Sequence, residues 1–375
     1  MNLLIDENIP GAREAFARFG SVRLMAGRAI DAAAVRDADA LLVRSVTRVD
    51  RALLAGSRVR FVATATAGTD HVRIAELDAL GIRFAHAPGS NADSVVDYVL
   101  GVLALAYPAP RGLAGRTVGI VGCGQVGARL LVRLRALGVA CRVYDPLLTR
   151  DIPPESCALQ ETLACEVLSL HVPLTREGAH ATRHLLGARE LARLRDDALL
   201  INAARGPVVD NAALLEAMRR RPALRAALDV WEHEPQLDRA LLARVLIGTP
   251  HIAGYAHDGK LRGARQVYAA LRAFLGAGAS PADPSELRPA PAGVLRAEDC
   301  GSWQQAVLAC YDPRGDDARL RAAMLDKDEG ARAAAFDRLR RDYPLRREFS
   351  AWRIGTAAAP GTPVHAALLA AGFAP

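Results

Sequence analysis

Lysine is nearly absent from this chain of 375 residues, where only Lys260 and Lys327 are lysines. The net charge of +7 is therefore carried by arginine. The arginines are scattered over predicted helix faces, and the one basic run, Arg338–Arg347, is interpreted as a solvated helix face or dimer contact rather than a nucleic-acid or phosphate site. A modest positive field of this kind suits small anionic substrates instead.

Sequence motifs for disulfide pairs, metal sites, membrane spans and export are also missing. The six cysteines form no CxxC pair and several lie in apolar runs, which predicts free, buried thiols in a reducing cytoplasm. HExxH and comparable ligand spacings are absent, so no metal site is expected. No apolar stretch approaches the ~20 residues of a membrane span, and the opening MNLLIDENIP resembles no export signal. We expect a cytoplasmic protein with no membrane partner.

Short apolar runs alternate with helical patterns along the chain, which is typical of α/β architecture with parallel sheets. A helix is expected from Asp93 to Ala106, and another from Lys260 to Leu275 that returns to the first sheet. The strands expected in a first sheet are Leu3–Ile5, Ala40–Val43, Arg60–Ala63 and Ile82–Phe84. Those expected in a second sheet are Val118–Val121, Val139–Tyr144, Val167–Leu170, Ala198–Ile201, Ala226–Asp229 and Val245–Ile247.

The composition changes near the C-terminal end. Residues 276–291 are rich in Gly, Pro, Ala and Ser and are interpreted as a linker. The residues after it predict a small α/β domain with one strand near Ala306–Tyr311. The domain borders that we expect are 1–92, completed by about 255–283, then 93–254, and finally 284–375.

A glycine-rich turn follows the strand at 118–121. It reads Gly122-x-Gly124-x-x-Gly127 and opens a predicted helix, and Asp145 ends the next strand. Glycines at this spacing let the backbone approach a pyrophosphate, which the helix N-terminus binds through its N–H groups. A carboxylate about 20 residues further on holds the ribose hydroxyls, so Asp145 favours NAD over NADP.

Three later stretches each follow a predicted strand: NAARGPVVD (202–210), ALDVWEHEP (227–235) and TPHIAGYAHDG (249–259). They are therefore expected at one edge of the sheet, beside the nicotinamide. Oxidation of a hydroxyl carbon needs a base, a cation for the substrate carboxylate and a partner for the base. We assign these roles to His251, Arg205 and Glu234, because a guanidinium grips a carboxylate with two hydrogen bonds and Glu234 can fix the imidazole tautomer.

With this order of motifs, the chain resembles the D-isomer-specific 2-hydroxyacid dehydrogenase family, whose catalytic Arg, Glu and His match the same three residues. The resemblance covers nearly the whole chain. It also rests on LLIDENIPGA (3–12), LLVRSVT (41–47), FVATATAGTDHV (61–72), HAPGSNADSVVDYVL (86–100), HVPLT (171–175), YDPRGDDARLR (311–321) and FDRLRRDYPLRREFSAW (336–352). Ser90 stands where relatives usually carry Cys.

The resemblance implies a Rossmann-type NAD-binding domain, a flavodoxin-like substrate domain and a small C-terminal dimerisation domain. It implies a phosphorylated 2-hydroxy acid as substrate and a homodimer. The residues implied for substrate are Ser45, Thr66 and Tyr255. Those implied for the cofactor are Gly122, Gly124, Gln125, Val126, Gly127, Asp145, Thr175, Asp229 and Gly254.

Some points stay open. For the substrate phosphate we consider Arg44, and more weakly Arg346 or Arg347 of a partner subunit. His233 and Glu232 are interpreted as solvated neighbours of Glu234, and Trp231 as core or hinge packing. The alternatives to this function are another D-2-hydroxyacid dehydrogenase, such as one acting on 3-phosphoglycerate, and a non-catalytic NAD-sensing co-regulator.

Overall fold

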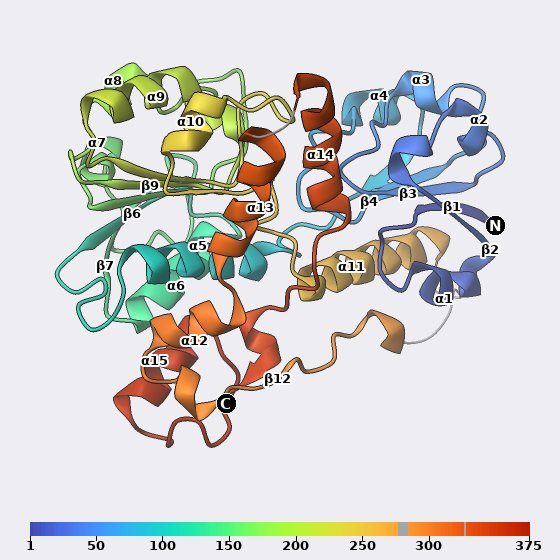
Figure 1. The fold of residues 1–375 in the computed structure, drawn as a ribbon. Helices are drawn as coiled ribbons and strands as arrows, with labels where there is room; N and C mark the ends of the chain where they lie inside the picture. Colours follow the sequence, from blue (N-terminus) through green and yellow to red (C-terminus); the bar gives the residue numbers. More distant parts are fainter. Residues whose placement is uncertain (277–283, 326–327) are drawn as a thin grey trace. The chain divides into compact units, whose positions relative to one another are not determined.

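The computed structural model describes residues 1–276, 284–325 and 328–375. They form two compact units (Figure 1). Unit 1 contains Met1–Ala92 and Ala256–Ala290, and unit 2 contains Asp93–Tyr255 and Pro291–Pro375. The C-terminal residues thus lie in the same unit as the central sheet, and the three-domain division stays a prediction. No helix in the described part of the chain has the length and apolar composition needed to cross a membrane.

Unit 1 is built on a five-stranded parallel sheet of order β2-β1-β3-β4-β5, the flavodoxin-like order that the family resemblance implied. Its strands are β1 (Asn2–Asp6), β2 (Ser21–Met25), β3 (Ala40–Val43), β4 (Phe61–Thr64) and β5 (Arg83–Ala85). Its helices are α1 (Ala12–Phe16), α2 (Ala32–Val35), α3 (Arg51–Leu54), α4 (Ile74–Ala79) and α11 (His257–Leu275). We did not predict β2, an edge strand that lacks a fully buried residue.

Both faces of this sheet are covered, because successive side chains of a strand point to opposite faces. Leu3 and Ile5 join a core with α1 and α11, whereas Leu4 joins the core on the other face. Helix α11 lies so close to the strand ends that a Cβ at Gly263 would stand 2.5 Å from the carbonyl oxygen of Ala65. The return of this helix to the first sheet is confirmed.

Unit 2 is built on a six-stranded parallel sheet of order β11-β10-β9-β8-β6-β7. Its strands are β6 (Thr117–Val121), β7 (Ala140–Tyr144), β8 (Val167–Leu170), β9 (Leu199–Asn202), β10 (Arg225–Leu228) and β11 (Ile247–Gly248). Its helices up to Tyr255 are α5 (Ala92–Ala106), α6 (Gly127–Ala136), α7 (Leu159–Leu163), α8 (Ala188–Leu191), α9 (Asn211–Arg220) and α10 (Arg239–Arg244). All six predicted strands are confirmed, and a bridge from Val143 to Ser156 extends the sheet beyond β7.

The C-terminal residues of unit 2 are mainly helical. They form β12 (Gly293–Val294), α12 (Trp303–Cys310), α13 (Pro313–Leu325), α14 (Glu329–Arg341), β13 (Trp352–Arg353) and α15 (Pro363–Ala371). The predicted strand at 306–311 is wrong, because residues 306–310 belong to α12 and Tyr311 follows its last turn. A short apolar run fits either structure, and the helix signal lay at Ser302, whose side chain caps the helix by accepting a hydrogen bond from the Gln305 amide.

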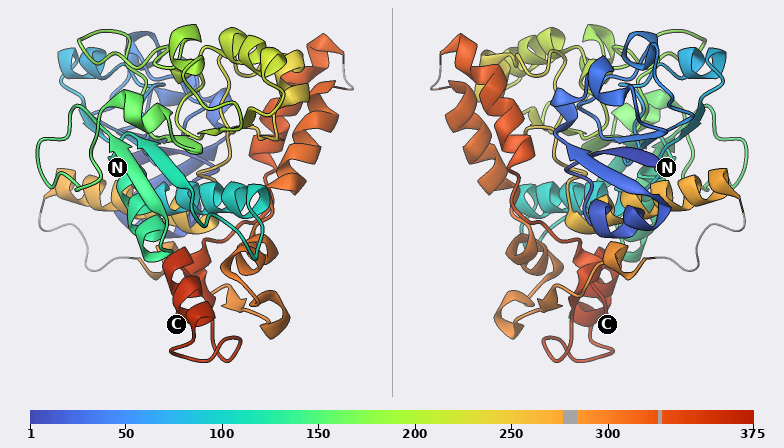
Figure 2. Two further views of the ribbon diagram at one scale, coloured as in Figure 1. Left: turned by 90° about the vertical axis from the view of Figure 1, so that its left-hand side faces the viewer. Right: turned by 90° about the vertical axis from the view of Figure 1, so that its right-hand side faces the viewer.

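Helices α13 and α14 pack against each other, as both views of Figure 2 show. Helix α13 also covers β11, the edge strand of the six-stranded sheet. There the Gly248 amide donates to Asp317 Oδ1 (2.7 Å), so the edge strand is hydrogen-bonded by a side chain. Covering an edge strand prevents it from pairing with another chain.

The segment after α14 is anchored on α5. The Phe349 amide donates to Asp97 Oδ2 at 2.9 Å, and the Ser94 hydroxyl donates to Glu348 Oε1 at 2.6 Å. Asp97 and Glu348 are both buried. Because a buried charged group must be paired or hydrogen-bonded, these contacts fix the C-terminal segment to the NAD-binding part of unit 2. Of the predicted linker 276–291, residues 277–283 lie outside the described residues.

Candidate active site

The three stretches singled out in the sequence follow β9, β10 and β11, which are neighbours in one parallel sheet. The three stretches therefore begin at the same end of the sheet, the carboxyl end of its strands, where parallel sheets of this kind bind ligands. After β9, Asn202 shapes the turn that carries Arg205. Its Oδ1 accepts from the Ala204 amide (3.1 Å) and its Nδ2 donates to the Arg205 carbonyl (3.1 Å).

Asp229, directly after β10, holds the loop that carries His251. Its carboxylate accepts hydrogen bonds from the Thr249 hydroxyl (2.7 Å) and from the amides of Ile252 (2.7 Å) and Ala253 (2.9 Å). His251 between them has φ of +58°, a left-handed conformation that is uncommon for a non-glycine residue. Backbone strain of this kind persists where surrounding contacts enforce it, and here those contacts converge on one buried carboxylate.

Burial also affects the ionisation of Asp229. It raises the pKa of the carboxyl above the usual value, although His251, Thr249 and the two loop amides oppose this shift. We predicted that Asp229 contacts the cofactor. In the structure its carboxylate oxygens are engaged by the loop, and the contact with the cofactor stays a prediction.

Glu234 and His251 form the central contact of the site. His251 Nδ1 lies 2.8 Å from Glu234 Oε2, and Glu234 Oε1 accepts from the Trp231 amide at 2.8 Å. Burial alone would raise the pKa of Glu234, but His251 and the Trp231 amide, with a smaller effect of Arg340, hold it below its usual value. An ionised Glu234 binds a protonated Nδ1, which leaves the lone pair of Nε2 for a proton from elsewhere.

The two residues before Glu234 lie in different environments. His233 is exposed. Glu232 is not the solvated carboxylate that we expected: its side chain is 12% exposed, and its Oε1 lies 2.5 Å from His184 Nε2. Its Oε2 accepts from the Asn211 amide at 3.2 Å. Glu232 therefore ties α9 to the loop before Glu234. Trp231 is buried in the core, as predicted.

The glycine-rich turn joins β6 to α6. Gly122 has φ of +90°, and a Cβ at Gly127 would stand 1.9 Å from the Gly122 carbonyl oxygen, so the helix meets the turn without side chains between them. At Gly124, by contrast, no described atom lies within 4 Å of a Cβ. Asp145 Oδ2 accepts from the Cys123 amide at 2.8 Å. These features fit a dinucleotide, because the backbone is open at Gly124 and a carboxylate stands beside it.

The other residues predicted for the cofactor lie near this sheet edge or on the turn. Gln125 accepts hydrogen bonds from Arg129, and Val126 immediately precedes α6. Thr175 is exposed and hydrogen-bonds Thr182, whereas Gly254 is half-buried in the loop after His251. Their contacts with the cofactor stay predictions.

In unit 1, Ser45 and Thr66 follow the adjacent strands β3 and β4. Ser45 is exposed, and the Thr66 hydroxyl donates to the Gly68 carbonyl (2.9 Å) and lies 2.7 Å from the Thr64 hydroxyl. Arg44 Nη1 donates to the Asn8 carbonyl at 3.2 Å. The ends of three neighbouring strands thus bring these residues to one edge of the unit 1 sheet.

The structure argues against one suggested phosphate ligand. Arg346 is buried, with 6% exposure, and its guanidinium donates to the carbonyls of Ser94 and Ala253 within its own chain. This placement inside its own chain does not fit the suggestion that Arg346 reaches the active site of a partner subunit.

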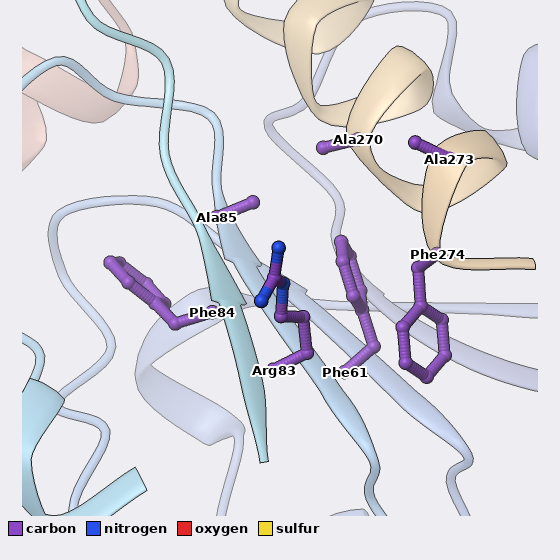
Figure 3. A pocket seen from close by; sticks show the side chains of 7 residues that line it. All are labelled: Phe61, Arg83, Phe84, Ala85, Ala270, Ala273 and Phe274. Carbon is purple, nitrogen blue, oxygen red and sulfur yellow. The ribbon is translucent and has the colours of Figure 1, made fainter. Parts of the chain in front are cut away.

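A hollow on unit 1 lies away from these residues. It is lined by Phe61, Arg83, Phe84, Ala85, Ala270, Ala273 and Phe274 (Figure 3). Most of these side chains are apolar, and none is a carboxylate, histidine or hydroxyl, so the hollow lacks an acid or base. It lies between the edge strand β5 and the C-terminal end of α11. Among the described residues no group of three or more His, Cys, Asp or Glu could hold a metal ion.

Two residues of the site were not predicted. Thr249 hydrogen-bonds Asp229 (2.7 Å) and Tyr98 (3.0 Å), which ties the loop to α5. Arg340 of α14 lies beside Tyr255. No local sequence signal marks Arg340, because it is one of several arginines in a basic helix end.

Comparison with known proteins agrees with this geometry. Residues 105–253 match the family described as "D-isomer specific 2-hydroxyacid dehydrogenase, NAD binding domain", and residues 296–369 match a domain of unknown function, DUF3410. An NAD-bound 3-phosphoglycerate dehydrogenase from Entamoeba histolytica is structurally similar, with a TM-score of 0.64 and 25% identity over 74% of this chain and 96% of that one. A D-lactate dehydrogenase from Aquifex aeolicus shares the fold, with a TM-score of 0.60 and 24% identity over 73% of this chain and 95% of that one. The fold and the residues at the carboxyl ends of β9, β10 and β11 together define an NAD-binding 2-hydroxyacid dehydrogenase.

The sequence relatives are more specific. An erythronate-4-phosphate dehydrogenase from Azotobacter vinelandii is 52% identical, with 94% of each chain covered. One from Pseudomonas aeruginosa is 50% identical, with 95% of each chain covered. The chain belongs to the erythronate-4-phosphate dehydrogenase family. It is therefore an NAD-dependent oxidoreductase.

Proposed function

We propose that the chain oxidises 4-phospho-D-erythronate at C2 to (R)-3-hydroxy-2-oxo-4-phosphooxybutanoate, in the biosynthesis of pyridoxal 5′-phosphate (vitamin B6). The observation that carries the chemistry is the 2.8 Å contact between His251 Nδ1 and Glu234, which supplies an oriented base. The substrate is taken from the relatives that share about half of the sequence over nearly the whole chain.

In this proposal His251 Nε2 accepts the proton of the C2 hydroxyl, and Glu234 stabilises the imidazolium that forms. Arg205 binds the substrate carboxylate and polarises the nascent ketone oxygen. NAD, held at the glycine-rich turn with Asp145 at its ribose, supplies the hydride acceptor when bound. Ser45, Thr66 and Tyr255 contact the substrate, and Arg44 is our candidate for its phosphate.

The test measures NADH formation with equal concentrations of 4-phospho-D-erythronate and 3-phosphoglycerate. We expect at least a 100-fold preference in kcat/KM for the first substrate; a preference for the second would make the chain a different dehydrogenase of the same class. His251→Ala should abolish NADH formation and leave NAD binding intact. If neither substrate were oxidised while NAD still bound, the NAD-sensing alternative would be favoured.

We also propose a cytoplasmic homodimer. All six cysteines are free thiols, as a reducing compartment would keep them. Val294, Leu345 and Leu369 of the C-terminal segment are 56%, 74% and 41% exposed, and contact with a second copy would remove such apolar side chains from water. Leu345→Asp should shift sedimentation towards the monomer, whereas Val132→Asp, at a residue of α6 that is 62% exposed, should not. Unchanged dimers in the first variant would argue against this surface.

A further inference from the structure

The C-terminal segment that matches a domain of unknown function reaches the loop that carries His251. Arg346 donates to the carbonyl of Ala253, two residues after His251. The ring of Tyr343 packs edge-on against the ring of Tyr255, with centroids 5.8 Å apart. The Tyr343 hydroxyl in turn donates to Asp316 Oδ2 on α13 at 2.8 Å. These contacts hold the backbone of the loop at Ala253 and the side chain of Tyr255.

Arg340, near the end of α14, adds a cation to these contacts. Its guanidinium carbon lies 5.6 Å from the centre of the Tyr255 ring and 5.9 Å from that of Phe336. Distances below about 6 Å are within the range of cation–π attraction. The guanidinium therefore lies within reach of two aromatic rings, and the Tyr255 ring belongs to the loop.

The donor at Arg340 Nε is buried and has no hydrogen-bond partner among the described residues. An unpaired buried donor costs free energy, and a charged donor costs more than a neutral one. Buried donors are normally paired, so the unpaired Nε of Arg340 calls for an explanation. Burial opposes the charge, but Tyr255, Glu234 and Asp229 raise the pKa of the Arg340 guanidinium above its usual value. The side chain is thus a cation that contacts the Tyr255 ring and is stabilised electrostatically by Glu234 and Asp229.

We infer that Arg340 is a positioning residue of the dehydrogenase site, which fixes the Tyr255 ring and sets the charge balance of the Glu234–His251 pair. This inference rests on the proposed function. The charged and titratable groups near the pair include Asp229, Tyr255 and Arg340, with Tyr343 and Arg346 behind them. Arg205 follows the neighbouring strand β9 at the same end of the sheet. The C-terminal segment thereby takes part in the chemistry of its own chain.

Electrostatics predicts the direction in which loss of the Arg340 charge shifts proton uptake by the Glu234–His251 pair. A cation beside the pair favours the Glu234 carboxylate and disfavours a second positive charge on the imidazole. Loss of the cation should let the pair take up its proton at higher pH. The acidic limb of the kcat/KM profile should then move to higher pH, because the base must be unprotonated to act.

The experiment compares Arg340→Met, Arg340→Lys and the control Arg338→Met in the full chain. Arg338 lies two residues away on α14 and is exposed. In Arg340→Met we expect the acidic limb to move up by about half a pH unit or more and kcat/KM to fall ~10-fold. Arg340→Lys should restore most of the limb position, since it keeps the charge, and Arg338→Met should match the parent enzyme.

A second measurement needs no substrate. The ring carbons of histidine can be labelled with ¹³C and His251 assigned by comparison with His251→Ala, so that its titration is followed by NMR with NAD bound. We expect the His251 titration in Arg340→Met to shift in the same direction as the kinetic limb. If Arg340→Met does not fold, Arg340→Lys and Arg340→Gln are compared instead.

The outcomes separate the two proposals. If the parent chain oxidises no phosphorylated hydroxy acid, the proposed function fails, and the NMR titration still tests Arg340. If a charge-removing variant titrates like the parent, or if Arg340→Lys shifts as far as the charge-removing variant, the inference about Arg340 is overturned.

Discussion

Glu234 and His251 are separated by 17 residues, and their side chains meet at 2.8 Å. The two residues follow adjacent parallel strands, and the buried carboxylate of Asp229 holds the second loop in place. Two features thus bring the pair together. The strands β10 and β11 are neighbours in the sheet, and the buried Asp229 carboxylate holds the loop that carries His251.

Replacing Glu234 by Gln should lower kcat/KM by about 100-fold, within the range of general acid–base effects. The pKa of Glu234 is lowered in the folded protein, so its charge is present above the ordinary carboxylate range and is lost only as the pH falls through the lowered value. Kinetics between pH 6 and 9 measure the loss where wild-type Glu234 is ionised. Glu232→Gln is the control and should stay within a few-fold of the parent; equal losses in both variants would contradict the pairing with His251.

The two glycines of the cofactor turn should respond differently to alanine. Gly127→Ala places a Cβ 1.9 Å from the Gly122 carbonyl oxygen and should lower the melting temperature as well as NAD affinity. Gly124→Ala meets no described atom within 4 Å, so the protein should stay as stable as the parent while its dissociation constant for NAD rises ~10-fold or more. Thermal unfolding and NAD fluorescence titration measure both. Unchanged NAD affinity in Gly124→Ala would place the pyrophosphate elsewhere.

Asp145 should decide between the two nicotinamide cofactors. Its carboxylate would lie beside the 2′-phosphate of NADP, a like charge, so Asp145→Ala should reduce the preference for NAD over NADP by at least ~10-fold, about 1.4 kcal/mol. Steady-state kinetics with each cofactor give the ratio. Since Asp145 also accepts from the Cys123 amide, Asp145→Asn keeps an acceptor and serves as the comparison. An unaltered ratio in both variants would remove Asp145 from cofactor selection.

Asp97 should make stability depend on pH. Burial raises the pKa of Asp97 to about 7, although Arg133 lowers it. The unfolded value is near 3.9. The folded state therefore binds the proton more tightly, and the free energy of unfolding falls as the pH rises from about 4 to 7, by at most about 1.4 kcal/mol per pH unit.

Asp97→Asn keeps an oxygen that can accept from the Phe349 amide and should remove this slope. Urea unfolding at pH 5, 6, 7 and 8 measures it. Asp93→Asn is the control, because Asp93 is a more exposed carboxylate that pairs with the same Arg133. A slope that persists in Asp97→Asn would show that another group causes it.

Much of the fold followed from local patterns. All the strands expected in the two sheets are present, because strands buried on both faces are continuous apolar runs. The exceptions were the partly exposed edge strand β2 and the apolar run at 306–311, which forms a helix capped by Ser302. In both places the apolar pattern was too weak or too short to decide between structures.

The sequence by itself determined which residues stand at the ends of the parallel strands, and hence the grouping of Arg205, Glu234 and His251 at one sheet edge. Only the tertiary structure decided that Glu232 is bound to His184, 48 residues away, and that Arg346 lies inside its own chain against Ala253, 93 residues away. The same holds for Arg340 beside Tyr255. The positions of strands along the chain follow from apolar patterns, which are local. The partner of a charged side chain instead depends on which helix packs beside it in the tertiary structure.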